Sequence, residues 1–518
     1  MKITARFLIV FLYILTSSYA TSQDLKLAEI FNEGAVLQCN SNVSVWGKSL
    51  PDEYIRIEIL GKHFDTKSDM KGFWQLKLSK MKAGGPFEMK VTSLLDTIKL
   101  QEIYFGEVWI AGGQSNMGWT LEKSTGGKEA IANAKNTNIR FVMVPYLAYE
   151  GDKNRGDMNW RTATTENVSQ MSGVAYFFAK ELQEKLKVPI GIICCYKGGS
   201  GAETWMSRES LLKRPELAPI VENYENYFSK LGKDKYLELM AKYESDMNQY
   251  RDSVKAGSTT LKAPKEPMGE QNYNRPYGLY NTMLKRVIPY SVKGAIWYQG
   301  EHNASRAEQY QTLFPAVIEQ WRSDFKNPTM PFLFVQLANY DNTGYGEKPI
   351  WAELREAQLL TWQKVKNTGM AVSIDVGEKK SIHPTQKEPV GKRLAAIALN
   401  TEYDIDIPYS GPVCKVAEFK KDRVILTFNF DYKGLKVDGE LKGFSICGKD
   451  KVFVPAKAEI KNNKVIVSYE GIEIPVALRY GWDNWTEANL MNSADLPATP
   501  FRTDKYPLLT KGVRTTKY

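Results

Sequence analysis

A serine between two amide side chains is the first feature of this sequence that could do chemistry. Val108 to Ala111 is typical of a buried strand, and the chain then continues as Gly112-Gly113-Gln114-Ser115-Asn116-Met117. The glycines allow a sharp turn, and the carboxyl end of a parallel strand is where open α/β folds build their sites. The N–H of Ser115, near the start of a helix, could face a developing oxyanion. An ordinary turn with an incidental serine would give the same local pattern.

A nucleophilic serine needs a base, and histidine is the usual one near neutral pH. The chain has 3 histidines, at positions 63, 302 and 383. His383 lies between the last predicted parallel strand and its helix, which places it at the same sheet edge as Ser115. His302 follows another strand and is the alternative, whereas His63 lies in a polar turn of a β region. We therefore predict that His383 is the base for Ser115.

Two more strand ends supply groups that could bind an oxyanion. One is the glycine-rich loop that contains Gly199, whose backbone N–H groups are free to point outward. The other carries Gln299, which offers a side-chain amide. Because the carboxyl ends of parallel strands share one edge of the sheet, these groups and the N–H of Ser115 could together form an oxyanion hole.

The acid that would orient the histidine is not determined by the sequence. Asp375 closes the strand that leads into the His383 loop, and Glu301 follows the strand of Gln299. Asp375 is favoured because the sheet would fix it beside the loop, although aspartate at such a position also caps turns. Glu378 belongs to a charged run that is more typical of a solvated surface. If neither Asp375 nor Glu301 serves, a Ser–His dyad remains.

The elements that must position these residues fall into successive regions. Residues 21–105 show the short alternating strands of a small β-sandwich. Residues 106–405 alternate apolar strands with helical patterns, which predicts an α/β domain with a parallel sheet covered on both faces. A helical insertion at 208–290 is either a lid or a surface elaboration. Residues 406–518 return to strands and predict a second β-rich unit.

The first 20 residues are typical of a secretory signal peptide. Lys2 and Arg6 precede the apolar run Phe7 to Leu15, and Ser18-Tyr19-Ala20 fits a cleavage site. The apolar run is shorter than the ~20 residues of a membrane-spanning helix, and no later segment is long and apolar enough. We therefore expect an exported protein, periplasmic or extracellular, without a membrane span.

Charge and cysteine content exclude several classes of function. The formal net charge is +10, but no basic cluster concentrates it, so nucleic acid binding is not expected. The 5 cysteines are an odd number for an exported protein and are interpreted mostly as buried free thiols. No spacing typical of a zinc site is present, and no metal or organic cofactor is indicated.

Taken together, these motifs resemble the sialate O-acetylesterase group of the SGNH/GDSL-like carbohydrate esterases. The resemblance covers nearly the whole mature chain, and its most specific elements are Gly113-Gln114-Ser115-Asn116-Met117, Gly198-Gly199, Trp297-Tyr298-Gln299-Gly300-Glu301 and Ile382-His383-Pro384. It implies a flavodoxin-like parallel sheet, Ser115 as nucleophile and His383 as base. It also implies an oxyanion hole formed by the N–H of Ser115, Gly199 and Gln299. Many relatives carry an aspartate two or three residues before the histidine, where this chain has Ser381 and Lys380.

The function that this resemblance implies is that of an exported serine esterase acting on acetylated carbohydrate. The expected substrate is 9-O-acetylated sialic acid, and acetylated xylan or pectin is the alternative. The competing hypothesis from another class is a glycan-binding protein on the same fold without catalytic activity. The only partner expected is the acetylated glycan itself.

Overall fold

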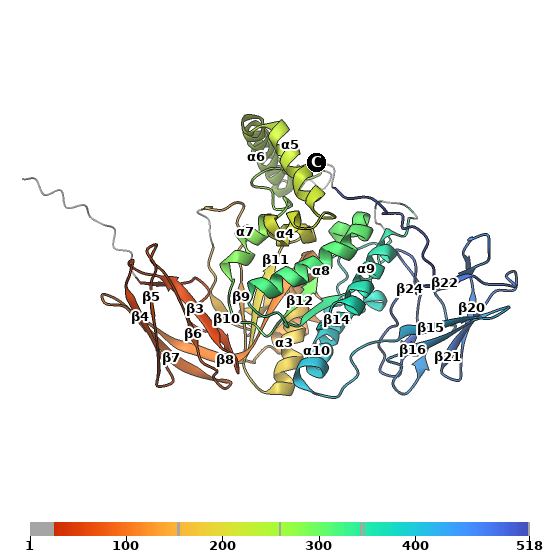
Figure 1. Cartoon of the computed structure of the whole chain (residues 1–518), viewed down its shortest axis with the longest axis horizontal. Coiled ribbons are helices and arrows are strands. Elements are labelled where there is room, and N and C mark those ends of the chain that lie inside the picture. Colours follow the sequence, from red (N-terminus) through yellow and green to blue (C-terminus); the bar gives the residue numbers. More distant parts are fainter. Residues whose placement is uncertain are drawn as a thin grey trace, which may run out of the picture.

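The computed structural model describes residues 25–152, 156–257, 261–341, 344, 346 and 348–515. The predicted signal peptide at residues 1–20 lies outside this range. Figure 1 shows a central α/β region flanked by N-terminal strands on one side and C-terminal strands on the other. The expected fold class, a parallel sheet between two β-rich units, is confirmed.

The parallel sheet is built from six strands whose residues are almost all buried, as expected for a sheet covered on both faces. The order is β9-β11-β8-β12-β13-β14, and the short strand β10 lies antiparallel at the β9 edge. The first strand of this region, β8, is therefore central, and the next strands lie on both sides of it. The strands β11-β8-β12-β13-β14 follow the flavodoxin order 2-1-3-4-5, and β9 extends the sheet beyond β11. The bounds are Thr97–Gly113 (β8), Ile139–Met143 (β9), Trp160–Thr162 (β10), Ile190–Tyr196 (β11), Gly294–Tyr298 (β12), Phe332–Val335 (β13) and Thr368–Ala371 (β14).

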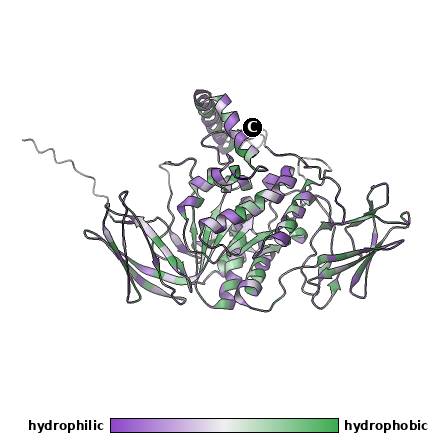
Figure 2. Cartoon of the chain, in the orientation of Figure 1, coloured by the Kyte–Doolittle hydropathy of each residue, from purple (hydrophilic) through white to green (hydrophobic). Residues whose placement is uncertain are grey.

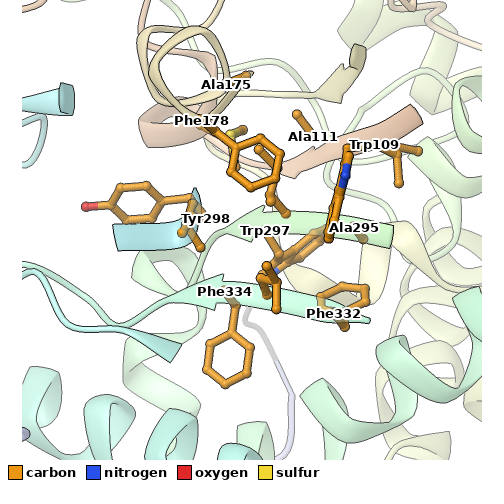
Figure 3. Close-up of a cluster of buried hydrophobic side chains, with 14 of the residues drawn as sticks. Trp109, Ala111, Ala175, Phe178, Ala295, Trp297, Tyr298, Phe332 and Phe334 are labelled. Atoms are coloured by element: carbon orange, nitrogen blue, oxygen red, sulfur yellow. The ribbon is translucent and has the colours of Figure 1, made fainter. Parts of the chain in front are cut away.

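Two pairs of helices cover the sheet. The pair α3 (Gly173–Leu186) and α10 (Lys387–Tyr403) pack together, as do α8 (Ala307–Asp324) and α9 (Ile350–Lys364). Trp109 of β8 contacts Phe178 of α3, with ring centroids 5.1 Å apart (Figure 3). A Cβ at Gly112 would meet Trp321 of α8 instead. Successive strand residues point to opposite faces, so α3 and α8 cover opposite faces of the sheet.

Strand β8 belongs to two sheets. Its first half pairs antiparallel with β7, and its second half is the centre of the parallel sheet. The border expected between residues 105 and 106 therefore lies inside one continuous strand. The other N-terminal strands are Lys26–Leu27 (β1), Val36–Gln38 (β2), Val43–Lys48 (β3), Tyr54–Ile59 (β4), Lys62–Lys67 (β5), Phe73–Leu78 (β6) and Gly84–Thr92 (β7).

The region expected to be an insertion contains helices that stand out from the body of the molecule (Figure 1). The protruding helices are α5 (Ala218–Leu231) and α6 (Lys233–Lys255), and the short helices α4 (Arg208–Leu212) and α7 (Gly278–Thr282) lie at their base. Figure 2 shows that hydrophobic residues are concentrated instead on the strands of the central sheet. None of the helices in the described ranges is long and apolar enough to cross a membrane.

The C-terminal strands form antiparallel sheets. One has the order β15-β16-β21-β20, another the order β19-β18-β22-β24, and β17 pairs with β23. Their bounds are Val413–Phe419 (β15), Val424–Asn429 (β16), Leu435–Lys436 (β17), Phe444–Cys447 (β18), Val454–Pro455 (β19), Lys457–Lys461 (β20), Lys464–Ser468 (β21), Ala477–Tyr480 (β22), Met491–Asn492 (β23) and Phe501–Arg502 (β24). All five cysteines are free, and all but Cys414 are buried, which confirms the interpretation as free thiols.

An aromatic cluster on β12 is the basis of a stability prediction. Trp297 is 1% exposed and packs against Phe332, with ring centroids 6.1 Å apart (Figure 3). It also packs against Trp321 and Phe314, whose ring centroids are 5.5 and 6.3 Å away. Removal of a buried indole leaves a cavity, so Trp297→Ala should lower the free energy of unfolding by about 3–5 kcal/mol. Urea unfolding followed by far-UV circular dichroism measures this. Tyr54→Ala, at a ring that is 74% exposed, is the control and should change little. Equal effects of the two substitutions would contradict the prediction.

Candidate active site

Ser115 lies at the carboxyl end of β8, at the start of the short helix α1 (Ser115–Gly118). Gly113 has a φ of +124°, and a Cβ there would lie 2.2 Å from the carbonyl oxygen of Tyr298 on β12. Only glycine permits both this conformation and this close approach. Because the helix begins at Ser115, its N–H has no intrahelical acceptor, and it remains available to a ligand oxygen.

His383 meets Ser115 across 268 residues of sequence. The Nε2 atom of His383 is 2.8 Å from the Oγ of Ser115. The histidine loop is held to the serine segment by Asn116, whose Nδ2 donates to the carbonyl of Ile382 at 2.9 Å. Burial and the charge of Lys387 lower the pKa of His383. The imidazole is thus neutral near pH 7 and can accept the serine proton.

The ring of His383 stacks on Trp119, a residue that the sequence analysis did not select. The ring centroids are 5.1 Å apart and the planes differ by 23°. The Nε1 of Trp119 donates to the carbonyl of Lys123 at 3.0 Å, which fixes the indole. The one sequence feature that could have identified Trp119 is its position four residues after Ser115.

Asp375 has a different partner from the one that the sequence suggested. It lies in the 3₁₀ turn η6 (Ile374–Val376), and its two carboxylate oxygens accept from Arg393 of α10 at 2.7 and 2.6 Å. Arg393 also donates to the carbonyl of Val372. The carboxylate is therefore used to fasten the end of β14 to α10. Within the described ranges, neither Asp375 nor Glu301 forms a hydrogen bond with His383.

Glu301 belongs to a buried polar chain beneath the serine. It begins η5 (Glu301–Arg306), and its Oε1 accepts from the Nδ2 of Asn116 at 2.5 Å. The Oδ1 of Asn116 accepts from the Nζ of Lys387 at 2.6 Å. Burial lowers the pKa of Lys387 to about 7 against the effect of Glu301 and Glu378, and burial raises the pKa of Glu301. Lys387 was not selected from the sequence, although it follows His383 by only four residues and begins α10.

The glycine loop after β11 reaches the serine through Gly198, the residue before the predicted Gly199. A Cβ at Gly198 would lie 3.5 Å from the Cβ of Ser115, and Gly199 has a φ of +72°. The His302 side chain hydrogen-bonds to the backbone of Gly199. The structure therefore assigns His302 to the support of this loop, while His383 contacts the serine.

Gln299 does not present its amide to the serine. It is fully buried, and its Nε2 donates to the carbonyl of Ser200 at 3.3 Å and to the Oδ1 of Asn303 at 2.6 Å. Its Oε1 accepts from the hydroxyl of Tyr310 at 2.8 Å. Both ends of the amide are thus engaged, and the expectation that Gln299 binds the oxyanion is corrected. Its amide instead supports the glycine loop through the carbonyl of Ser200.

A buried ion pair completes the support of that loop. Glu203, in η3 (Ala202–Trp205), pairs with Arg306 at 2.5 Å and accepts from Asn303 at 2.8 Å. Burial would raise the pKa of Glu203, but Arg306 and its other partners hold it at about 2. The carboxylate is thus ionised and hydrogen-bonded at every working pH, as a buried charge must be.

The contacts of Asp375 lead to a first prediction for the site. Asp375→Asn removes a charge that faces Arg393, so it should reduce stability slightly while kcat stays within about tenfold of wild type. A triad aspartate replaced in this way costs about 10⁴-fold. Steady-state kinetics with p-nitrophenyl acetate distinguishes the two results. A loss of several orders of magnitude in a folded variant would restore Asp375 as the missing acid.

Lys387 leads to a prediction on pH dependence. Its positive charge opposes protonation of His383, so Lys387→Met should raise the pKa of His383. Because His383 must be neutral to act as a base, the acid limb of the kcat/KM profile should move to higher pH. Lys379→Met replaces a largely exposed lysine of the His383 loop and is the matched control. It should leave the acid limb of the kcat/KM profile in place. A limb that stays or moves to lower pH in Lys387→Met would contradict this assignment.

Comparisons with known proteins agree with this geometry. The family model for carbohydrate esterase, sialic acid-specific acetylesterase, matches residues 106–255 and 265–400, more than half of the chain. The mouse sialate O-acetylesterase is 27% identical, with 95% of this chain and 97% of that protein covered. The human sialate O-acetylesterase is 26% identical, with 92% of each covered.

A solved structure is similar over almost the whole molecule. It is a carbohydrate acetylesterase from Xanthomonas citri, with a TM-score of 0.78 and 35% identity, and 93% of this chain and 100% of that chain are covered. The predicted family and the predicted class of enzyme, a carbohydrate O-acetylesterase, are thereby confirmed. The chain belongs to the sialic acid-specific acetylesterase family of carbohydrate esterases.

Proposed function

We propose that this protein is an exported serine esterase that removes O-acetyl groups from sialic acids, with 9-O-acetylated sialic acid as the expected substrate. The observation that carries the proposal is the 2.8 Å contact between Ser115 Oγ and His383 Nε2 in a member of this family. The mouse and human relatives, which align over nearly their whole length, are sialate O-acetylesterases. Export rests on the signal-peptide pattern of residues 1–20.

In the proposed mechanism, the Oγ of Ser115 attacks the acetyl carbonyl while His383 takes its proton. The N–H groups of Ser115 and Gly199 stabilise the oxyanion of the tetrahedral intermediate. His383 then returns the proton to the departing sugar oxygen, which leaves an acetyl-enzyme. Water activated by His383 hydrolyses this ester, and acetate is released.

This mechanism uses a Ser–His dyad. Ser381 stands where many relatives carry an aspartate, and its Oγ accepts from the backbone N–H of His383 at 3.2 Å. The imidazole is oriented instead by the face of Trp119. An indole face also attracts the imidazolium that forms during the reaction, by about 0.5–2 kcal/mol. Trp119 is thus a positioning residue in this proposal.

Two other functions compete with this one. The first is deacetylation of a plant polysaccharide such as acetylated xylan or pectin, and it is favoured by the broader name of the Xanthomonas citri protein, a carbohydrate acetylesterase. Mass spectrometry of acetate loss from a panel of acetylated glycans distinguishes these substrates. The second is glycan binding without catalysis, which is favoured because no carboxylate in the described ranges forms a hydrogen bond with His383. A pure binder would release no nitrophenol from p-nitrophenyl acetate above the blank.

Substitution of the dyad tests the mechanism. Ser115→Ala and His383→Ala should each lower turnover by several orders of magnitude, and the double variant should be little worse, since residues that act as a unit are not additive. His302→Ala should retain most of the activity, because His302 transfers no proton in this mechanism and only supports the glycine loop. Turnover of p-nitrophenyl acetate and circular dichroism of each variant provide the measurement. A folded Ser115→Ala protein with wild-type turnover would exclude Ser115 as nucleophile, and a severe His302→Ala with a mild His383→Ala would reverse the assignment of the base.

A further inference from the structure

Lys197 is the first residue of the glycine loop that adjoins Ser115. It follows β11, and its backbone N–H donates to the carbonyl of Gly113 at 3.1 Å, which ties it to the end of β8. The next residue, Gly198, adjoins Ser115. A Cβ at Gly199 would lie 3.0 Å from the hydroxyl of Tyr273. Lys197 and Tyr273 are therefore neighbours of the same loop that borders the serine.

The ammonium group of Lys197 is placed by two tyrosine rings. Its Nζ is 4.1 Å from the ring centroid of Tyr146 and 5.0 Å from that of Tyr273. The two rings stand edge to face, with centroids 6.3 Å apart and planes at 89°. Tyr146 follows β9, and Tyr273 follows the protruding helices α5 and α6. Three segments that are distant in sequence thus converge on one lysine side chain.

This cation has no carboxylate partner within ion-pair distance in the described part of the chain. Glu266 is the nearby acidic group whose charge acts on Lys197, and burial raises the pKa of Glu266. Burial in turn lowers the pKa of Lys197. A partly buried charge without a counter-ion is costly, and contact with aromatic faces offsets only part of that cost. The three N–H donors of the ammonium are suited to a carboxylate supplied from outside.

We propose that Lys197, held by Tyr146 and Tyr273, forms a subsite for the carboxylate of an acidic sugar beside Ser115. The inference rests on the proposed function and deepens it, since it names the group that would select an acidic sugar over a neutral one. In the bound state the sugar carboxylate accepts hydrogen bonds from Lys197, and the acetyl ester lies at Ser115. The subsite would discriminate by charge, because a neutral acetylated sugar leaves the ammonium without a counter-ion.

The test compares two substrates that differ only in this charge. They are 9-O-acetyl-N-acetylneuraminic acid and its methyl ester, and acetate release from each is measured with the full-length protein. A hydrogen bond to a charged group contributes about 1.5–3 kcal/mol, so wild type should prefer the acid by about 10- to 100-fold in kcat/KM. Lys197→Met should bring this ratio close to one, mainly through a higher KM for the acid.

Lys123→Met is the matched control. Lys123 also lies over an aromatic ring near the site, with its Nζ 6.0 Å from the ring centroid of Trp119. Its replacement should leave the acid-to-ester ratio as in wild type. An equal kcat/KM for acid and ester in wild type would overturn the subsite. An equal loss for both substrates in Lys197→Met would also overturn it, because it would reduce Lys197 to a structural support of the loop.

Failure of the subsite and failure of the proposed function give different results. Hydrolysis of p-nitrophenyl acetate that persists in Ser115→Ala would overturn the serine mechanism, whatever the acid-to-ester ratio. Hydrolysis that depends on Ser115, with no acetate release from either sialic acid substrate, would overturn sialic acid as substrate and the subsite with it. Serine-dependent release from both substrates at equal rates would overturn the subsite alone.

Discussion

The close approach of β8 and β12 at Gly113 is the constraint on which the site depends. The backbone of Gln114 donates to the carbonyl of Tyr298 at 3.0 Å, and no side chain fits between the two strands at Gly113. This contact ends β8 and starts α1 at one fixed point, so it sets where Ser115 projects. The glycine loop after β11 then closes on the serine from the neighbouring strand. The hydroxyl of Ser115 is therefore positioned by backbone geometry, before any of its side-chain partners are considered.

Two buried hydrogen-bond networks hold the loops in place around Ser115. Beneath the serine, Asn116 joins Glu301, Lys387 and the carbonyl next to His383, so a single amide connects η5, α10 and the histidine loop. Beneath the glycine loop, the amides of Gln299 and Asn303 and a buried ion pair play the same part. A buried polar group without a partner is costly. These networks thus favour one arrangement of the loops over slightly displaced ones.

The surroundings of His383 differ from those of a triad histidine. Among the residues that the structure describes, no carboxylate hydrogen-bonds to the ring, and the charged group that influences its pKa is Lys387, which opposes protonation. The flat contact with Trp119 restricts the orientation of the ring, and His383 is partly buried. A base with a lowered pKa is a weaker proton acceptor but is neutral over a wider pH range. The arrangement favours a simple leaving group such as a sugar hydroxyl, whose ester requires less activation than an amide.

The sequence by itself indicated the parallel sheet. It also indicated that His383 and the glycine loop would approach Ser115. It could do so because these depend on local patterns: apolar strands indicate the sheet, and the carboxyl ends of parallel strands share one edge. Only the tertiary structure decided the partners of Asp375, Glu301 and Gln299, and it alone brought Trp119, Lys197 and Lys387 to the site. A strand end indicates which edge a residue occupies but not which neighbour its side chain will bind. That choice depends on packing between distant segments, as when Arg393 of α10 takes the carboxylate of Asp375.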